Sequence, residues 1–178
     1  MSPFFMYGNR YMDSLPNIID IEASGFGRGS YPIEVGYILA NGDTFCSLIL
    51  PADDWKKWDV SAEQIHGVTR EILSQAGQPL NHIAETLNHQ LSGKTLYSDA
   101  WGNDASWLGK LFDEANLPMR YRLDSIRALL TENQAACWHQ TKGEVLESTP
   151  LKRHRASSDA AILQKTFALI QSRYQQAS

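Results

Sequence analysis

The sequence predicts an α/β domain in which a mixed β-sheet of about five strands has helices on both faces. Three observations support this fold class. The run 17–25 is rich in apolar β-branched residues and stops at a small-residue turn, as a buried strand does. The β-rich runs 33–40 and 44–50 flank Asn41-Gly42 and predict an antiparallel hairpin. Several later segments repeat apolar residues three and four apart, as amphipathic helices do.

Short elements are expected to follow the hairpin. Residues 52–58 fit one helical turn that carries two tryptophans. Ser61 is expected to cap a short helix that Gly67 ends, and Thr69 to cap the turn after it. Apolar residues at helical spacing then predict an amphipathic helix over 80–91.

The second half of the chain is expected to alternate strands and helices. The expected elements are a strand at 94–99, a helix from about Asp104, a short strand at 121–123, a helix over 126–138, a polar connector at 141–150 and a long C-terminal helix. Ser157 or Ser158 is expected to cap this C-terminal helix, with Asp159 in its first turn.

Composition limits the function classes that remain. The length of 178 residues fits one domain, which we place at 17–178 behind a loose leader at 1–16. A net charge of −4 argues against a protein that coats nucleic acid with a broad basic surface, although a small local footprint remains compatible. The two cysteines lack metal or disulfide spacing, and no apolar run is long enough to span a bilayer. We therefore expect a cytoplasmic protein that does not enter membranes.

Acidic residues recur where predicted strands and helices meet. Asp20 and Glu22 lie two apart on one strand, so they share a face and could share a cation. A strand with a solvated acidic face explains these two residues equally well. Asp104 falls in the first turn of a helix, where it either binds a ligand or complements the helix dipole. Glu34 is either a group near these acids or, as the safer interpretation, an exposed strand residue.

The segment before the C-terminal helix carries a base beside an acid. His154 precedes Asp159 in a His-x-Ala-x-x-Asp pattern, and Lys152 and Arg153 come just before it. Imidazole accepts protons near neutral pH, and the basic residues supply cations for phosphate oxygens.

In this order the motifs resemble those of the DEDDh 3′-to-5′ exonucleases, which have a ribonuclease H-like fold. Relatives include ribonuclease T, oligoribonuclease and proofreading subunits of DNA polymerases. Asp20–Gly25 is similar to the first motif, Ile33–Gly36 to the second strand, Ile65–Thr69 to a His-Gly-Ile-Thr segment, Asp104–Leu108 to the second motif and His154–Asp159 to the third. The resemblance covers nearly all of the chain after the leader.

Two positions depart from the family pattern. Ser98-Asp99-Ala100 stands where relatives have His-Asn-Ala, which makes Asp99 a rival to Asp104 as the second-motif acid. Asp104 is favoured because the helical pattern after it continues in the family's phase. Phe26 replaces an aliphatic residue that in relatives lies against the terminal base, and an aromatic ring would stack well there.

The resemblance implies a set of site residues and cofactors. Two divalent cations, Mg²⁺ or Mn²⁺, would be held by carboxylates, and His154 would be the general base. The implied metal ligands are Asp20, Glu22, Asp104 and Asp159. The implied substrate contacts are Ala23, Ser24, Gly25, Phe26, His66 and Arg155.

The implied activity is hydrolysis of terminal phosphodiester bonds at the 3′ end of single-stranded DNA or RNA, with release of nucleoside 5′-monophosphates. An inactive nucleic-acid-binding module of the same fold is one alternative. A proofreading subunit of a polymerase is another. The resemblance is also compatible with a homodimer.

Overall fold

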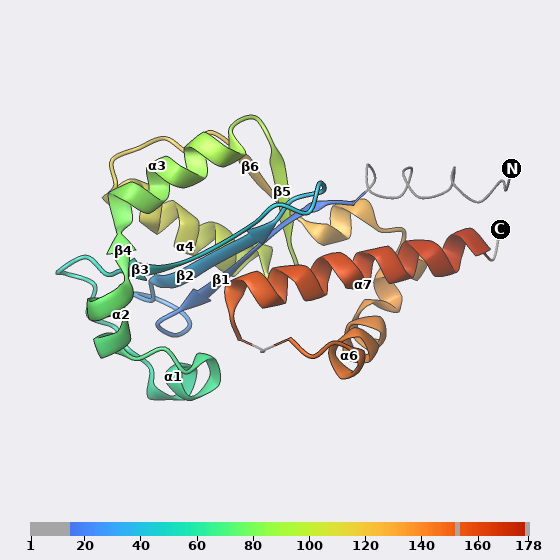
Figure 1. Ribbon diagram of the computed structural model, residues 1–178, viewed down its shortest axis with the longest axis horizontal. Coiled ribbons are helices and arrows are strands. Elements are labelled where there is room, and N and C mark those ends of the chain that lie inside the picture. The colour runs from blue at the N-terminus through green and yellow to red at the C-terminus, as the bar shows by residue number, and fades with distance from the viewer. Residues whose placement is uncertain (1–14, 152–153, 177–178) are drawn as a thin grey trace, which may run out of the picture.

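The computed structural model describes residues 15–151 and 154–176 (Figure 1). Most of the expected leader at 1–16, and the basic pair Lys152 and Arg153, lie outside the described residues. A six-stranded sheet in the order β4-β3-β2-β1-β5-β6 forms the centre of the fold. Its strands are β1 (Asn17–Ala23), β2 (Pro32–Ile38), β3 (Thr44–Leu50), β4 (Gln78–Pro79), β5 (Thr95–Ser98) and β6 (Arg122–Ser125). The two-residue β4 is one strand more than the sequence predicted.

Strand pairing confirms the mixed sheet. β1 is antiparallel to β2, with Asp20 opposite Gly36 and Glu22 opposite Glu34. β1 is parallel to β5, which in turn is parallel to β6. The predicted hairpin forms from β2 and β3. β1 therefore lies inside the sheet, with a partner along each side.

Helices cover both faces of the sheet, as Figure 1 shows. α3 (Leu80–Leu91) and α4 (Trp101–Glu114) lie on one face, and α7 (Ala156–Gln176) lies along the other with α6 (Trp138–Ser148) packed against it. The short helices α1 (Val60–His66) and α2 (Arg70–Ala76) lie at one end of the sheet. None of the described helices combines the length and apolar character needed to cross a membrane.

The alternation of side chains along β1 separates core residues from acids. Ile19, Ile21 and Ala23 are buried in the core cluster that contains the α3 and α4 side chains. Ile18 belongs to the cluster on the opposite face, under α7. Because side chains alternate across a strand, Asp20 and Glu22 lie on the α7 face with Ile18.

Three local predictions near the hairpin and α4 need correction. Residues 52–58 form a turn and irregular chain, not a helical turn. Asp59 caps α1 in place of Ser61, because its carboxylate accepts hydrogen bonds from both the amide and the hydroxyl of Ser61. α4 begins at Trp101, three residues before Asp104. The predicted end at Gly67 and the Thr69 cap are confirmed.

The region after β6 differs most from the prediction. The single helix expected over 126–138 is broken into the 3-10 helix η2 (Ile126–Leu129) and α5 (Glu132–Ala136). The break arises because Thr131 and Gln134 form a capping box, which starts a new helix. The connector expected at 141–150 is instead largely helix α6, whose Trp138, Thr141 and Val145 are buried. Tertiary packing therefore stabilises a segment whose composition is mostly polar.

Candidate active site

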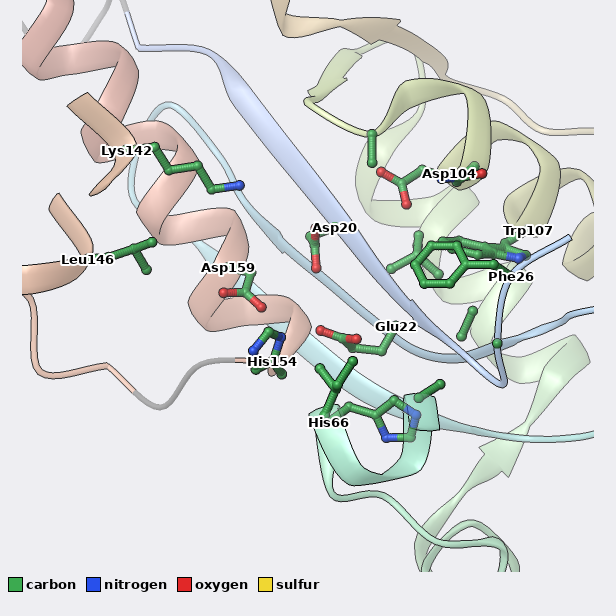
Figure 2. A pocket seen from close by; sticks show the side chains of 17 residues that line it. Asp20, Glu22, Phe26, His66, Asp104, Trp107, Lys142, Leu146, His154 and Asp159 are labelled. Atoms are coloured by element: carbon green, nitrogen blue, oxygen red, sulfur yellow. The ribbon is translucent and has the colours of Figure 1, made fainter. Parts of the chain in front are cut away.

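A pocket of about 390 Å³ lies beside the carboxyl-terminal half of β1 (Figure 2). Its lining comes from β1, the glycine-rich loop after it, α1, α4, α6 and the start of α7. The lining residues are Asp20, Ile21, Glu22, Ala23, Gly25, Phe26, Ala62, Ile65, His66, Ala100, Asn103, Asp104, Trp107, Lys142, Leu146, His154 and Asp159. The five predicted catalytic residues are all among them.

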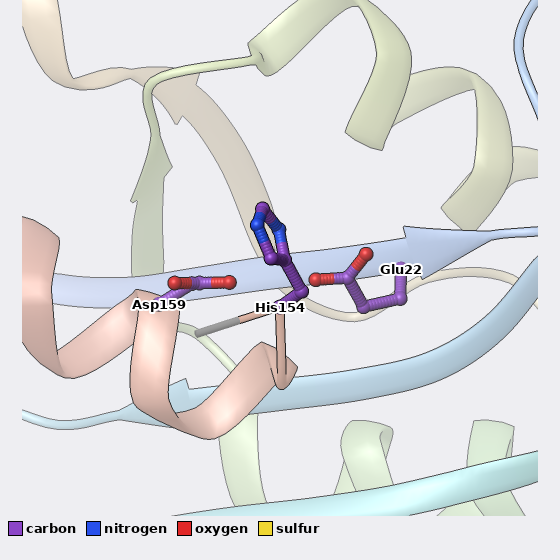
Figure 3. Close-up of side chains that lie close together, drawn as sticks. All are labelled: Glu22, His154 and Asp159. Carbon is purple, nitrogen blue, oxygen red and sulfur yellow. The ribbon is translucent and has the colours of Figure 1, made fainter. Parts of the chain in front are cut away.

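Glu22, His154 and Asp159 lie close together in the pocket (Figure 3). Each offers one ligand atom, and these atoms lie within 4.8 Å of one another. Asp20 and Asp104 line the same pocket. Carboxylate oxygens are the donors that Mg²⁺ and Mn²⁺ prefer, so the carboxylates present fit the divalent cations expected from the sequence.

The carboxyl groups strongly oppose one another's ionisation. Burial raises the pKa of Asp20 well above its usual value, and the charges of Asp104 and Glu22 raise it further. The pKa of Glu22 is raised to about 8, by burial first and then by the charges of Asp159 and Glu34. Groups in this state bind protons near neutral pH or are neutralised by cations. The electrostatics therefore favour a bound cation.

Asp104 and Asp99, the two candidates for the second-motif acid, have different surroundings. Asp104 is buried, lines the pocket and accepts a hydrogen bond from the Ser98 hydroxyl. Burial and the charge of Asp99 raise the pKa of Asp104, while the Ser98 bond opposes this rise. Asp99 pairs with Lys142 on α6, with 2.6 Å between carboxylate oxygen and ammonium nitrogen. Asp104 is thus the acid that faces the other carboxylates.

The start of α7 is held by Glu34 of β2. This side chain is fully buried, so the safer prediction that it is exposed is wrong. Its carboxylate accepts hydrogen bonds from Nη2 of Arg155 at 2.6 Å and from the amide of Ala156 at 2.9 Å. The carboxylate of a strand residue therefore accepts the hydrogen bond of the first amide of the helix. It takes the place of the expected Ser157 or Ser158 cap, since both serines lie inside α7.

Close packing at this point depends on Gly36, and His154 nearby has a left-handed backbone conformation. A Cβ at Gly36 would lie 2.2 Å from the amide nitrogen of Ser157, so only glycine lets the helix approach β2 this closely. His154, two residues before the helix, has a φ of 57°, which is uncommon for a residue with a side chain. We call the contacts of Glu34 with Arg155 and Ala156 the α7 clamp, because they fix the start of this helix.

The predicted substrate contacts divide into two groups. Ala23, Gly25, Phe26 and His66 line the pocket. Ser24 is buried beneath the loop, where its hydroxyl accepts a hydrogen bond from the amide of Tyr31 at 3.2 Å. The structure does not bring Ser24 or Arg155 to the pocket, because the first holds the loop and the second belongs to the α7 clamp.

Aromatic side chains form the end of the pocket near the glycine-rich loop. Phe26 is 65% exposed, and its ring centroid lies 6.0 Å from that of Trp107. The indole nitrogen of Trp107 donates to the Ser30 hydroxyl at 2.9 Å, which fixes the ring. His66 is 5% exposed and its Nδ1 accepts from the Val68 amide, so the proton of the neutral ring lies on Nε2. Burial lowers the pKa of His66, which keeps this ring neutral.

The comparisons with known proteins identify the fold. No family model matches the chain, and no curated protein matches it either. Solved structures of exonuclease I do match. The chain shares their fold. The E. coli enzyme with a dA16 oligonucleotide has a TM-score of 0.71 at 12% identity, covering 90% of this chain and 41% of that one.

Two further structures agree with this result. The E. coli enzyme with a dT13 oligonucleotide gives a TM-score of 0.70 at 13% identity, covering 90% of this chain and 42% of that chain. Exonuclease I from Methylocaldum szegediense gives 0.68 at 12% identity, covering 88% and 40%. The chain therefore spans about two fifths of the length of the exonucleases that it resembles.

Sequence reasoning missed several residues that line the pocket. Lys142 and Leu146 come from α6, a segment predicted to be a connector. A signal was present, because Trp138, Thr141 and Val145 recur at spacings of three and four, as on the buried side of a helix. Trp107 lies within the helix that the sequence predicts from about Asp104, although its position next to Phe26 depends on the fold of the loop.

Proposed function

We propose that this chain is a metal-dependent 3′-to-5′ exonuclease that acts on single-stranded DNA or RNA and releases nucleoside 5′-monophosphates. One observation carries the proposal: four carboxylates and an imidazole, from β1, α4 and the start of α7, line one pocket. The shared fold with exonuclease I, which was crystallised with dA16 and dT13 oligonucleotides, supports the same class of substrate.

The carboxylates of Asp20, Glu22, Asp104 and Asp159 would hold two divalent cations, Mg²⁺ or Mn²⁺. Such cations, when bound, lower the pKa of water and stabilise negative charge on phosphate oxygens. The raised pKa values of Asp20 and Glu22 support this assignment, because the group has an excess of negative charge that cations would neutralise.

The protein's own groups position the reactants and move a proton. His154 would accept a proton from the attacking water while the water oxygen forms a bond to phosphorus. The bond between phosphorus and the 3′ oxygen breaks, and that oxygen leaves with the shortened chain and takes up a proton. Phe26 and Trp107 would stack on the terminal base, and the backbone at Gly25 would approach the terminal nucleotide.

The decisive test follows the products from 5′-labelled single-stranded DNA and RNA of matched sequence. With Mg²⁺ or Mn²⁺ we expect stepwise shortening from the 3′ end and release of nucleoside 5′-monophosphates. EDTA should stop the reaction reversibly, and Asp20→Ala or Asp159→Ala should lower it by roughly a thousandfold or more while circular dichroism stays native. Full activity in EDTA or in either variant would exclude the proposed mechanism. Tight oligonucleotide binding without hydrolysis would favour a binding module.

A further inference from the structure

Helix α6 contributes a positively charged side chain, Lys142, to a pocket that is rich in acidic residues. Lys142 and Leu146 both line the pocket and lie four residues apart, so they share one face of the helix. Figure 2 shows the two side chains on the opposite side of Asp20 and Asp159 from Phe26 and Trp107. The pocket therefore has an aromatic end, an acidic middle and an end made by α6.

An ion pair holds the Lys142 ammonium in place. Its nitrogen lies 2.6 Å from the carboxylate of Asp99, and the two side chains are 32% and 20% exposed. Asp99 follows β5, so the pair connects α6 to the loop that leads into α4. An ammonium carries three N–H donors, so the group can donate to a phosphate oxygen as well as to Asp99.

The path of a bound strand follows from these positions. If the 3′-terminal base stacks on Phe26 and Trp107 and the scissile phosphate lies at the carboxylates, the rest of the strand continues toward α6. There the negative charge of the next phosphate would be repelled by the nearby carboxylates unless a positively charged side chain offset the repulsion. Lys142 is placed to provide that compensation.

We propose that α6 forms a subsite for the second nucleotide from the 3′ end. Lys142 binds the phosphate on the 5′ side of that nucleotide, and Leu146 contacts its base or sugar. The inference rests on the proposed exonuclease function and extends it, because it names which part of the substrate α6 recognises. Asp99 acts as a positioning residue that orients the ammonium.

Two substrates separate this role from a general effect on the site. A 5′-labelled single-stranded tetranucleotide has a phosphate in the proposed subsite. The p-nitrophenyl ester of thymidine 5′-monophosphate has one phosphate and no second nucleotide. Lys142→Ala should raise KM for the tetranucleotide about tenfold more than KM for the ester, with kcat changed much less. The salt dependence of KM for the tetranucleotide should also decrease by about one phosphate contact.

Matched variants sharpen the measurement. Lys142→Arg should retain most of the tetranucleotide affinity because it keeps the charge. Lys165→Ala removes an exposed lysine of α7 and should leave both substrates unaffected. Asp99→Asn should give a weaker form of the Lys142→Ala result. Leu146→Ala should raise KM more for a tetranucleotide with a second base than for one that is abasic at that position.

The outcomes are distinct. Equal effects of Lys142→Ala on both substrates would place the lysine at the reacting phosphate and overturn the subsite. If Lys142→Ala changes KM for neither substrate, the ion pair with Asp99 is only a structural contact, and the subsite proposal is also overturned. If the unmodified protein cleaves neither substrate, the exonuclease proposal fails. The affinity of a labelled oligonucleotide in Ca²⁺, measured with and without Lys142→Ala, would then still decide whether α6 binds the strand.

Discussion

Single residues decide which acid of the second motif belongs to the site. Asp104 lines the pocket and accepts from Ser98, whereas Asp99 pairs with Lys142. Asp104→Asn should therefore lower hydrolysis by orders of magnitude, because it removes one of the four carboxylates proposed to hold the cations. Asp99→Asn should lower it about tenfold or less, through Lys142. Turnover of a 5′-labelled oligonucleotide measures both, and the opposite ranking would identify Asp99 as the ligand.

His154 should be recognisable from its pH dependence. His154→Ala removes the group proposed to accept the proton of the attacking water, so turnover at neutral pH should fall strongly, by roughly a hundredfold or more. Raising the pH should restore part of the loss, because hydroxide replaces the water that needs a base. The measurement is kcat for wild type and variant over a pH series. A constant ratio between the two across the series would exclude this role for His154.

Local periodicity was enough to place Asp20 and Glu22 on one strand face and Asp159 in the first turn of a helix. Their grouping into one site was predicted from the order of the motifs, which resembles that of the DEDDh exonucleases. Ser24 and Arg155 lie outside the pocket for a reason that local sequence does not contain. Each has a partner distant in the sequence or across a loop, Tyr31 for Ser24 and Glu34 for Arg155.

Among the elements, the position of helix α7 depends on a side chain of strand β2. Glu34 binds Arg155 and the amide of Ala156, and it thereby positions the segment that carries His154 and Asp159. Glu34→Gln should weaken the α7 clamp and lower the free energy of unfolding by roughly 1–3 kcal/mol, a value discounted because Arg155 is partly exposed. It should also lower kcat more than it raises KM, since the displaced groups, His154 and Asp159, are the ones proposed to act in the reaction.

A matched variant tests whether the effect belongs to the α7 clamp. Glu144 and Arg173 form an ion pair of 2.5 Å between α6 and α7, with side chains 37% and 47% exposed. Glu144→Gln should lower the free energy of unfolding much less than Glu34→Gln does, because this ion pair is exposed to solvent, and it should leave kcat unchanged. Urea unfolding and steady-state kinetics measure both variants. If Glu34→Gln behaves like Glu144→Gln, the clamp does not position the catalytic segment.

The elements were predictable in proportion to their own apolar periodicity. The helix over 80–91 is confirmed with its predicted bounds, because leucine and isoleucine recur on one face of α3. α6 was missed because its sequence is mostly polar and its helical conformation depends on packing Trp138 and Val145 against the rest of the fold. The Thr131 capping box, which starts α5, is a local signal that periodicity alone did not reveal.

For the whole molecule, the acidic group makes stability depend on pH and on cations. The pKa of Glu22 is about 8 in the folded protein and about 4.5 as an isolated side chain, so the folded state binds more protons between these values. Stability without metal should therefore fall as the pH rises from about 4.5 to about 8, and level off above. The raised pKa values of Asp20 and Asp104 act in the same direction.

Thermal unfolding in EDTA over this pH range checks the sign. Glu22→Gln should flatten the decline and stabilise the metal-free protein near pH 8, on the order of 1–3 kcal/mol after allowance for partial exposure. Mg²⁺ or Mn²⁺ should raise the Tm of wild type most at high pH, because cations bind the ionised acids of the folded state. A Tm in EDTA that rises from pH 5 to pH 8 would contradict the electrostatic description of the site.

The path of the chain through the site also bears on how the protein is made. Asp20 lies on β1, near the beginning of the described chain, and Asp159 lies in the first turn of α7, near its end. A ribosome therefore releases the sheet and most of the helices before it supplies Asp159 and His154. The nascent chain acquires its full set of acids and its base only after α7 has emerged and docked, a non-local step that is slow compared with helix formation. Until then, the messenger RNA beside it is not exposed to the assembled pocket.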